Sequence, residues 1–489
     1  MKVAICFPPI ESKKGVPLLT QNRQFQWFNS PTYIYPVIPA YAATLLKNNG
    51  HEVLWADGIA KEQSEKEWFD FIVEKKPELV AIETKTPVIK KHWQIINKLK
   101  KISSKTEDWK LKIVLMGDHV TALPEESLNN SKVDYVIKSG DFDFLLLSIA
   151  NHLDKATSLE KGIYYREGSL INNTGEYGFH SHKLTELPLI DRQLTEWKLY
   201  AYKNGNFKYT PGSYLMSGRD CWWGKCTFCS WTTLFPGSKF RKMSAQQALS
   251  EVKRLIDLGV KEIMEDSGSL PIGDWLYEFC RGMIKYGFNK KVTLSCNMRI
   301  NGIKNIETWK LMKKAGFRFI LFGLESANQE TLDKIKKGLK VEEIEPNLKI
   351  CKQAGLEPHI TAMIGYPWES KAEAKKTVDL AKRLFKKGYV DTLQATVVIP
   401  YPGTPLYKYC REKKLLNFVD YDRYDQREQV MKSELTTADV KELTQGLYKS
   451  FISPQFIWRK IINIKNLDDV KYLFRSSMKF FGHLIDFRK

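Results

Sequence analysis

The stretch Gly218-Arg219-Asp220-Cys221-Trp222-Trp223-Gly224-Lys225-Cys226-Thr227-Phe228-Cys229 gathers three of the chain's eight cysteines behind a predicted strand at residues 213–217. Their spacing is CxxxxCxxC. A structural zinc site takes four protein ligands, and iron–sulfur clusters also usually take four thiolates. Three crowded cysteines therefore predict a cluster that leaves one iron open to another ligand. A zinc site completed by Cys280 or Cys296 is the alternative.

Outward from this loop, residues 211–407 alternate six predicted strands with helical patterns, which predicts a partial (β/α)6 barrel of TIM type. The strands are 213–217, 262–265, 292–295, 319–322, 360–364 and 393–398, and the helices are 245–258, 275–286, 306–314, 342–354 and 372–386. In such a barrel, the side chains that follow the strands gather on one rim. The expected rim residues are Cys221, Glu265, Asp266, Asn297, Arg299, Glu325, Ser326, Gly365, Pro367 and Pro400.

Residues 1–155 contain five βα repeats, which predict a parallel, doubly wound, Rossmann-like sheet. The predicted strands are 2–7, 51–56, 79–83, 112–116 and 133–137. Sheets of this kind bind ligands beyond the carboxyl ends of their strands. The residues expected there are Pro8, Pro9, Asp57, Thr84, Thr86, Gly117, Asp118 and His119. No GxGxxG follows the first strand, so a nicotinamide or flavin dinucleotide is not the expected ligand.

The two remaining segments have weaker patterns. Residues 156–210 show scattered Gly, Asn, His and Pro, and they predict an irregular connector. Residues 408–489 predict a basic helical region, with ten Lys or Arg against four Asp or Glu after position 440 and with interleaved aromatic residues. This tail fits either a packing helix with a solvated basic face or a peripheral membrane contact.

Composition limits the possible classes of protein. With 489 residues, 43% of them apolar and 27% charged, the chain is expected to fold into two or three globular domains. No run of apolar residues is long enough to span a bilayer, and the start of the chain does not resemble a signal peptide, so a cytoplasmic location is expected. The net charge of +20 suits an anionic partner, although a lysine-rich proteome would give the same excess of basic over acidic residues. No nucleic-acid module is recognisable, so no nucleic acid is expected as a partner.

The chain resembles the cobalamin-binding branch of the radical S-adenosylmethionine (SAM) superfamily over roughly residues 1–410. The resemblance rests on the cysteine loop with Phe228 before its last cysteine, on the doubly wound domain in front, and on three later motifs. These are Phe322-Gly323-Leu324-Glu325-Ser326, Ile364-Gly365-Tyr366-Pro367-Trp368-Glu369 and Pro400-Tyr401-Pro402-Gly403-Thr404-Pro405-Leu406-Tyr407.

The sequence departs from the family pattern at three places. The cysteine motif has one residue more than the usual CxxxCxxC, which puts the path of the loop in question. The D-x-H-x-x-G motif that supplies a cobalt ligand is absent, because Asp118 and His119 are adjacent. The segment Ser139-Gly140-Asp141-Phe142-Asp143 stands where the family usually has glycine followed by acidic residues, with Glu at the position of Asp143.

The resemblance implies cofactors and the residues that hold them. A 4Fe-4S cluster would be held by Cys221, Cys226 and Cys229, with SAM on the fourth iron. Contacts to SAM would come from Phe228, Glu265, Asp266, Asn297, Arg299, Glu325, Ser326 and Gly365. Cobalamin, held without a histidine on cobalt, would lie near Pro8, Pro9, Asp57, Thr84, Thr86, Gly117 and His119.

The implied activity is cleavage of SAM to a 5′-deoxyadenosyl radical, used for cobalamin-dependent methylation of an unactivated carbon. Two alternatives remain open: a radical rearrangement, cyclisation or coupling without methyl transfer, and a zinc-stabilised binding protein without turnover. The expected partners are a small-molecule or lipid substrate and an external low-potential electron donor.

Overall fold

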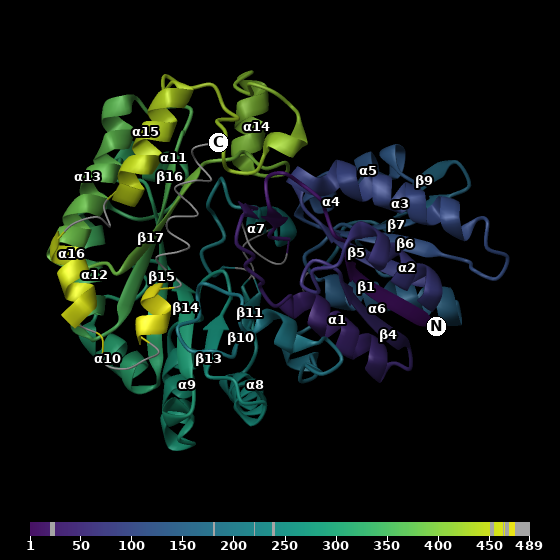
Figure 1. Ribbon diagram of the computed structural model, residues 1–489, viewed down its shortest axis with the longest axis horizontal. Coiled ribbons are helices and arrows are strands. Elements are labelled where there is room, and N and C mark those ends of the chain that lie inside the picture. The colour runs from purple at the N-terminus through teal and green to yellow at the C-terminus, as the bar shows by residue number, and fades with distance from the viewer. Residues whose placement is uncertain are drawn as a thin grey trace.

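Two α/β domains lie side by side in the computed structural model, and a C-terminal segment packs against both (Figure 1). The structure describes residues 1–19, 25–178, 181–219, 221–236, 240–449, 454–462, 464 and 469–474. Part of the predicted basic tail, including residues 475–489, lies outside the described residues. The α/β fold class expected from the sequence is confirmed, with a Rossmann-like domain followed by a partial barrel.

The first sheet has strand order β4-β1-β5-β6-β7-β8-β9. Its first five members are parallel, which is the doubly wound order 2-1-3-4-5 with a switch point between β1 and β5. Helices α1 and α6 pack together on one face, while α2 and α3 contact each other on the other. The bounds are β1 Lys2–Phe7, β4 Glu52–Asp57, β5 Leu79–Thr84, β6 Lys112–Gly117, β7 Tyr135–Ile137, α1 Val37–Asn48, α2 Glu65–Lys75, α3 Ile89–Ser103, α4 Asp118–Ala122, α5 Pro124–Asn130 and α6 Phe142–Lys155.

The predicted connector contains a hairpin that the sequence did not indicate. Strands β8 (Ile163–Glu167) and β9 (Leu170–Asn173) extend the first sheet, with β8 antiparallel to β7. Only Ile163 is fully buried in this hairpin, so the alternation of apolar and polar residues that marks a strand is weak. Further along, the short 3₁₀ helices Leu184–Glu186 and Trp197–Tyr200 lead into the second domain.

The second sheet has six parallel strands in the order β10-β13-β14-β15-β16-β17, with β10 and β17 as its two edges. It is therefore an open half-barrel, as the sequence predicts. The strands are β10 Gly212–Leu215, β13 Glu262–Glu265, β14 Thr293–Met298, β15 Phe317–Glu325, β16 Glu357–Ile364 and β17 Thr392–Val397. The outer helices are α8 Ala245–Asp257, α9 Asp274–Lys285, α10 Ile306–Lys314, α12 Val341–Gln353 and α13 Lys371–Lys387, and α11 (Gln329–Lys334) precedes α12.

An N-terminal segment covers the open side of the half-barrel. The Gln394 side chain on β17 donates to Oε1 of Gln26 over 3.3 Å, and the Phe25 backbone N–H donates to the Tyr401 hydroxyl over 3.4 Å. On the side nearer β10, the Asn204 side chain donates to the Tyr33 carbonyl over 2.8 Å. The first domain thus supplies part of the wall around the barrel interior.

A buried ionic network joins the two domains immediately before the cysteine loop. Arg219, in the short strand β11 (Gly218–Arg219), donates to Asp141 and Asp143, with Nη1 2.9 Å from an oxygen of each. Arg241 also donates to Asp141, at 2.6 and 2.9 Å. Burial raises the pKa of Asp141, but the two guanidinium groups outweigh this and hold it below its usual value. The segment that departs from the family pattern therefore anchors the cysteine loop to the first domain.

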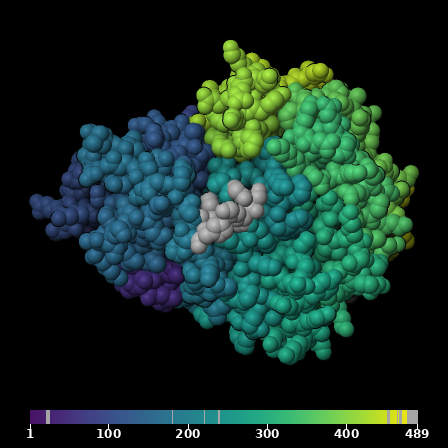
Figure 2. All heavy atoms as spheres, turned by 180° about the vertical axis from the view of Figure 1, so that it is seen from behind, coloured from purple at the N-terminus to yellow at the C-terminus, as the bar shows by residue number. Residues whose placement is uncertain are grey.

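The C-terminal segment bridges the domains and then packs on the barrel. Helix α14 (Pro405–Glu412) and the chain after it lie across the top of both domains in Figure 2. The 3₁₀ helix Tyr421–Arg423 contacts α3, and Asp420 pairs with Lys90 at 2.5 Å. Helix α15 (Thr437–Tyr448) packs on β17, and α16 (Pro454–Ile462) contacts α13. Within the described ranges, no helix is both long and apolar enough to cross a membrane.

Candidate functional site

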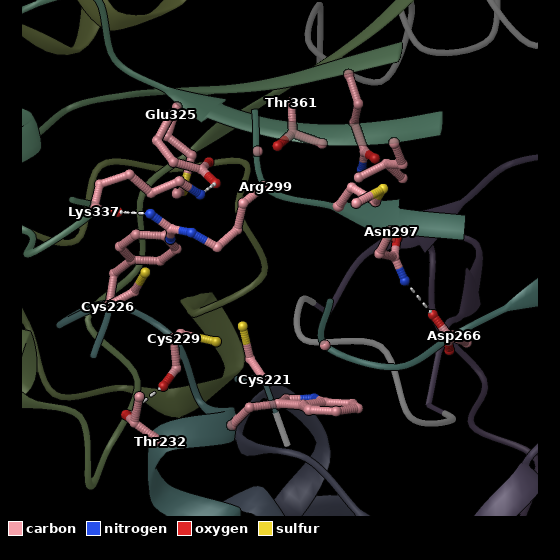
Figure 3. A pocket seen from close by; sticks show the side chains of 18 of the residues that line it. Cys221, Cys226, Cys229, Thr232, Asp266, Asn297, Arg299, Glu325, Lys337 and Thr361 are labelled. Carbon is pink, nitrogen blue, oxygen red and sulfur yellow. Dashed lines mark hydrogen bonds and ion pairs between the residues drawn. The ribbon is translucent and has the colours of Figure 1, made fainter. Parts of the chain in front are cut away.

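One large cavity occupies the interior of the half-barrel and reaches the first domain. The predicted residues that line it are Cys221, Cys226, Phe228, Cys229, Asp266, Asn297, Arg299 and Glu325. Figure 3 shows the cysteines, Arg299, Glu325 and Lys337 on one side of this space, with Asp266 and Asn297 on the other. Glu265, Ser326 and Gly365 lie near the same rim but do not line the cavity.

The three cysteines share this cavity because of the path of their loop. The sulfur atoms of Cys221 and Cys229 point toward one another, and the Cys226 side chain lies beside them (Figure 3). The Thr227 N–H donates to the Ile335 carbonyl over 3.0 Å, and its carbonyl accepts from the Leu406 N–H over 2.9 Å. These bonds fix the loop between α11 and α14.

The longer gap in the motif is filled by Trp222, Trp223, Gly224 and Lys225. Gly224 has φ +56°, a left-handed conformation that favours glycine and lets the loop absorb the extra residue. The Trp222 and Trp223 indoles donate to the backbone carbonyls of Leu270 and Lys336, at 3.3 and 2.8 Å. The loop is thus anchored through two consecutive indoles within the longer gap.

Two cations stand beside the cysteines. The Arg299 guanidinium lies 4.2 Å from the centre of the Trp223 ring and donates to the Lys337 and Gly338 carbonyls. The Lys337 ammonium lies 2.8 Å from Oε1 of Glu325, and both side chains are buried. Burial raises the pKa of the Cys226 thiol to about 12, while Lys337 and Arg299 act to lower it. The cysteine side of the cavity is therefore suited to an anionic group.

The other predicted SAM contacts divide into cavity-facing and structural groups. The Asn297 side chain donates to Asp266 over 2.9 Å, which orients both polar groups at the cavity. Glu265 instead accepts from the backbone and hydroxyl of Ser217, at 2.8 and 2.7 Å. The Ser326 hydroxyl donates to Glu369 over 2.8 Å and so ties the end of β15 to the segment after β16.

The residues predicted to lie near cobalamin follow β1, β4, β5 and β6, as expected, and are buried or hydrogen-bonded to one another. Asp57 accepts from the Tyr200 hydroxyl over 2.6 Å, and burial raises its pKa to about 6. The His119 ring nitrogens contact Thr86 at 3.2 Å and Glu126 at 2.8 Å. Gly117 has φ +131°, and a Cβ there would lie 2.0 Å from the Thr84 carbonyl oxygen. Pro8 and Pro9 are buried, and Thr84 contacts His92.

Comparison with protein families identifies the second domain. Residues 216–381 match the model of the radical SAM superfamily, a range that contains the cysteine loop and most of the half-barrel. Residues 216–381 are therefore a radical SAM domain. This match favours an enzyme over the zinc-stabilised binding protein.

Similarity to known proteins extends over both domains. An uncharacterized methyltransferase of Pyrococcus horikoshii is 25% identical over 96% of this chain and 95% of its own length. The anaerobic magnesium-protoporphyrin IX monomethyl ester cyclase of Cereibacter sphaeroides is 23% identical over 85% of this chain and 66% of its own. The radical SAM methyltransferase TsrM from Kitasatospora setae, solved with cobalamin and a [4Fe-4S] cluster, has the same fold, with a TM-score of 0.68, 13% identity, and coverage of 93% of this chain and 89% of that one.

The described residues fit the cluster and the SAM of a radical SAM protein. Burial keeps the Cys226 thiol protonated when it is alone, whereas a thiol that coordinates a metal is deprotonated. The adjacent Arg299 and Lys337 would then compensate the negative charge of the cluster. Among the described residues, no group of three or more Cys, His, Asp or Glu side chains is arranged to hold a metal ion. The fit therefore rests on the shared cavity and the charges around it. Cys280 and Cys296, the expected fourth zinc ligands, do not line the cavity.

Sequence reasoning missed several polar residues that line the cavity, among them Lys337, Gln426 and His359. Lys337 follows α11, and Gln426 lies after α14, so neither stands at the carboxyl end of a strand, where the barrel pattern predicts functional side chains. His359 is on β16 but lies near the start of the strand. The pair Lys337-Gly338 after a helix was the available local signal for the first, since a glycine there lets the chain turn back toward the barrel.

Proposed function

We propose that this protein is a cobalamin-dependent radical SAM methyltransferase that methylates an unactivated carbon. The observation that carries the proposal is the cavity itself, which runs from the three cysteines to side chains at the domain boundary such as Ile34 and Phe235. A cluster, SAM, substrate and corrin would thus share one enclosed space. The similarity to methyltransferases along nearly the whole chain supports the same assignment.

In this proposal, the chain's own residues bind and orient the reactants. When bound, the cluster would supply the electron that breaks a carbon–sulfur bond of SAM, and an external donor of low potential would have to reduce it. Cys221, Cys226 and Cys229 hold the cluster, Arg299 pairs with the SAM carboxylate, and Asp266 accepts from its ammonium group. The cavity walls exclude water from the reacting carbon.

The cavity lining nearer the first domain is mostly apolar with a few polar groups, which suits an apolar ligand that carries amide groups, such as a corrin. This lining includes Ile34, Trp231, Phe235, Ile399 and Tyr401. Oε1 of Gln426 is buried there and has no hydrogen-bond partner among the described residues, so it can accept from a ligand amide. The His119 nitrogens already have partners, which supports a cobalt held without this histidine.

Anaerobic reconstitution tests the methyltransferase proposal. The purified protein is expected to bind iron, sulfide and a corrinoid, and to release both 5′-deoxyadenosine and S-adenosylhomocysteine with a substrate. Cys226→Ala should lose the brown chromophore and lower nucleoside release by more than about a hundredfold, because the cluster loses one of its three thiolates. Full activity in Cys226→Ala would contradict the assignment.

Ring closure without methyl transfer is the second candidate, supported by the similarity to the cyclase over 85% of this chain. It uses the same cysteines and the same SAM cleavage. The two candidates differ in their products, because only methyl transfer yields S-adenosylhomocysteine. Release of 5′-deoxyadenosine alone, with a substrate converted to a product of unchanged carbon count, would favour cyclisation.

We also propose that the protein contacts a membrane surface through α16, which would place it beside a lipid substrate or a membrane-bound donor. The support is an exposed apolar face with Ile457, Trp458, Ile461 and Ile462 between 49% and 65% exposed. Arg459 and Lys460 of the same helix bond to the Phe385 carbonyl and to Asp391 on the barrel side, so the apolar face is the part of α16 that is open to a membrane.

A further inference from the structure

The cavity wall formed by the last two strands of the half-barrel carries uncharged polar side chains. His359 and Thr361 lie on β16 and Gln394 on β17, and Thr361 is paired in register with Gln394. We call these three residues the β16–β17 wall. The Thr361 hydroxyl faces the open part of the cavity in Figure 3. The charged residues that line the cavity come from other segments: Lys225, Asp266, Arg299, Glu325 and Lys337.

His359 has one ring nitrogen without a partner. Its Nδ1 lies 2.8 Å from the Thr392 hydroxyl, and its ring packs against Phe319 at 5.3 Å between centroids. Its Nε2 is buried and has no hydrogen-bond partner in the part of the chain that the structure describes. Burial lowers the pKa of His359 to about 3, so the ring is neutral and Nε2 either donates or accepts, depending on the tautomer. Leaving such an atom unpaired is unfavourable, and a ligand in the cavity can satisfy it.

We propose that the β16–β17 wall binds an uncharged hydrogen-bonding group of the substrate, such as a hydroxyl, carbonyl or amide, with His359 as its main contact. This inference rests on the proposed function, because it takes the cavity to hold the substrate beside SAM. The substrate would then carry an uncharged polar group at this wall, and His359 would be a specificity-determining residue.

Charged and purely hydrocarbon groups fit this wall less well. A carboxylate or phosphate there would lose water without gaining a cation, because in the proposed function Arg299 already pairs with the SAM carboxylate, and Lys337 pairs with Glu325. A hydrocarbon would leave Nε2 of His359 unsatisfied. The end of the substrate that faces the wall is therefore both polar and neutral.

Benzamide and benzoate test the proposal, because they have nearly the same shape and differ in charge. Each is titrated into the anaerobically reconstituted protein with SAM bound and no reductant present, and binding is followed by calorimetry and by the ¹⁵N resonances of the histidine rings. Benzamide is expected to bind about tenfold more tightly than benzoate and to shift the Nε2 resonance of His359, since only the amide is matched by the neutral wall.

Two variants locate the effect. His359→Phe keeps an aromatic ring against Phe319 but removes both nitrogens, and it should weaken benzamide binding about fivefold or more. His92→Phe is the matched control, because His92 is also buried, has a pKa lowered to about 3 and has an unpaired Nε2, but does not line the cavity. It should leave benzamide binding unchanged.

The proposal is overturned if benzoate binds as tightly as benzamide, if benzamide does not bind, or if His359→Phe binds benzamide like the unaltered protein. None of these readouts depends on SAM cleavage. If the protein prefers benzamide over benzoate but transfers no methyl group, only the proposed function is contradicted. If it transfers a methyl group but does not prefer benzamide, only the proposed role of the β16–β17 wall is contradicted.

Discussion

Lys337 shows how a single residue controls the charge of the site. It forms a buried pair with Glu325 at 2.8 Å, beside the cysteines. Lys337→Met leaves the Glu325 carboxylate buried without a partner, so we expect the free energy of unfolding of the cluster-free protein to fall by about 3 kcal/mol. Urea unfolding followed by near-ultraviolet circular dichroism measures this change.

The double variant Lys337→Met/Glu325→Gln provides the control for that experiment. It removes both charges and should recover more than half of the lost stability, because the unpaired buried carboxylate causes most of the loss. If the single and double variants unfold at the same urea concentration, the pair is not the source of the effect.

At the scale of an element, α16 differs from the other helices of the barrel domain in its exposed apolar face. Trp458→Glu places a charge in the middle of that face, and we expect it to remove most of the binding to vesicles rich in phosphatidylserine. Co-sedimentation measures the bound fraction. Tyr202→Glu is the control, because Tyr202 is 55% exposed in a different segment. Equal binding of both variants and the unaltered protein would rule out α16 as the contact.

At the scale of the molecule, the buried network around Arg219 links the cysteine loop to the first domain. In Arg219→Met, Arg241 is the cation that remains beside Asp141, and Asp143 has lost its cation. We therefore expect hydrogen exchange to rise at least about tenfold in residues 139–143, with a lower iron content after reconstitution. Hydrogen-exchange mass spectrometry detects the first change and iron analysis the second.

Arg318→Met separates this linkage from a general loss of stability. Arg318 is equally buried and pairs with Glu262 and Glu357 at 2.6 Å, but all three residues belong to the barrel domain. Its loss should destabilise the barrel without increasing exchange in residues 139–143. Increased exchange there in both variants would mean that the Arg219 network does not specifically join the domains.

The sequence by itself determined the element order, the two sheets and the cysteine loop. Apolar periodicity and residue spacing are local properties, so strands such as Lys2–Phe7 and Glu262–Glu265 could be located to within a residue or two. The sequence did not predict the hairpin β8–β9, because this solvated edge of the sheet shows little alternation of apolar and polar residues. Rim residues such as Asp266, Asn297 and Arg299 were found because parallel strands end on one side of a sheet.

Only the tertiary structure decided which of these side chains share a space and which charges meet. It shows that Asp266 lines the cavity, whereas the neighbouring Glu265 accepts a hydrogen bond from the Ser217 backbone N–H. It also brought Lys337 and Gln426 to the cavity, and Asp141 to Arg219, across long stretches of chain. Such partners are fixed by how the two domains and the connecting loops pack in three dimensions, and no short-range pattern in the sequence contains that information.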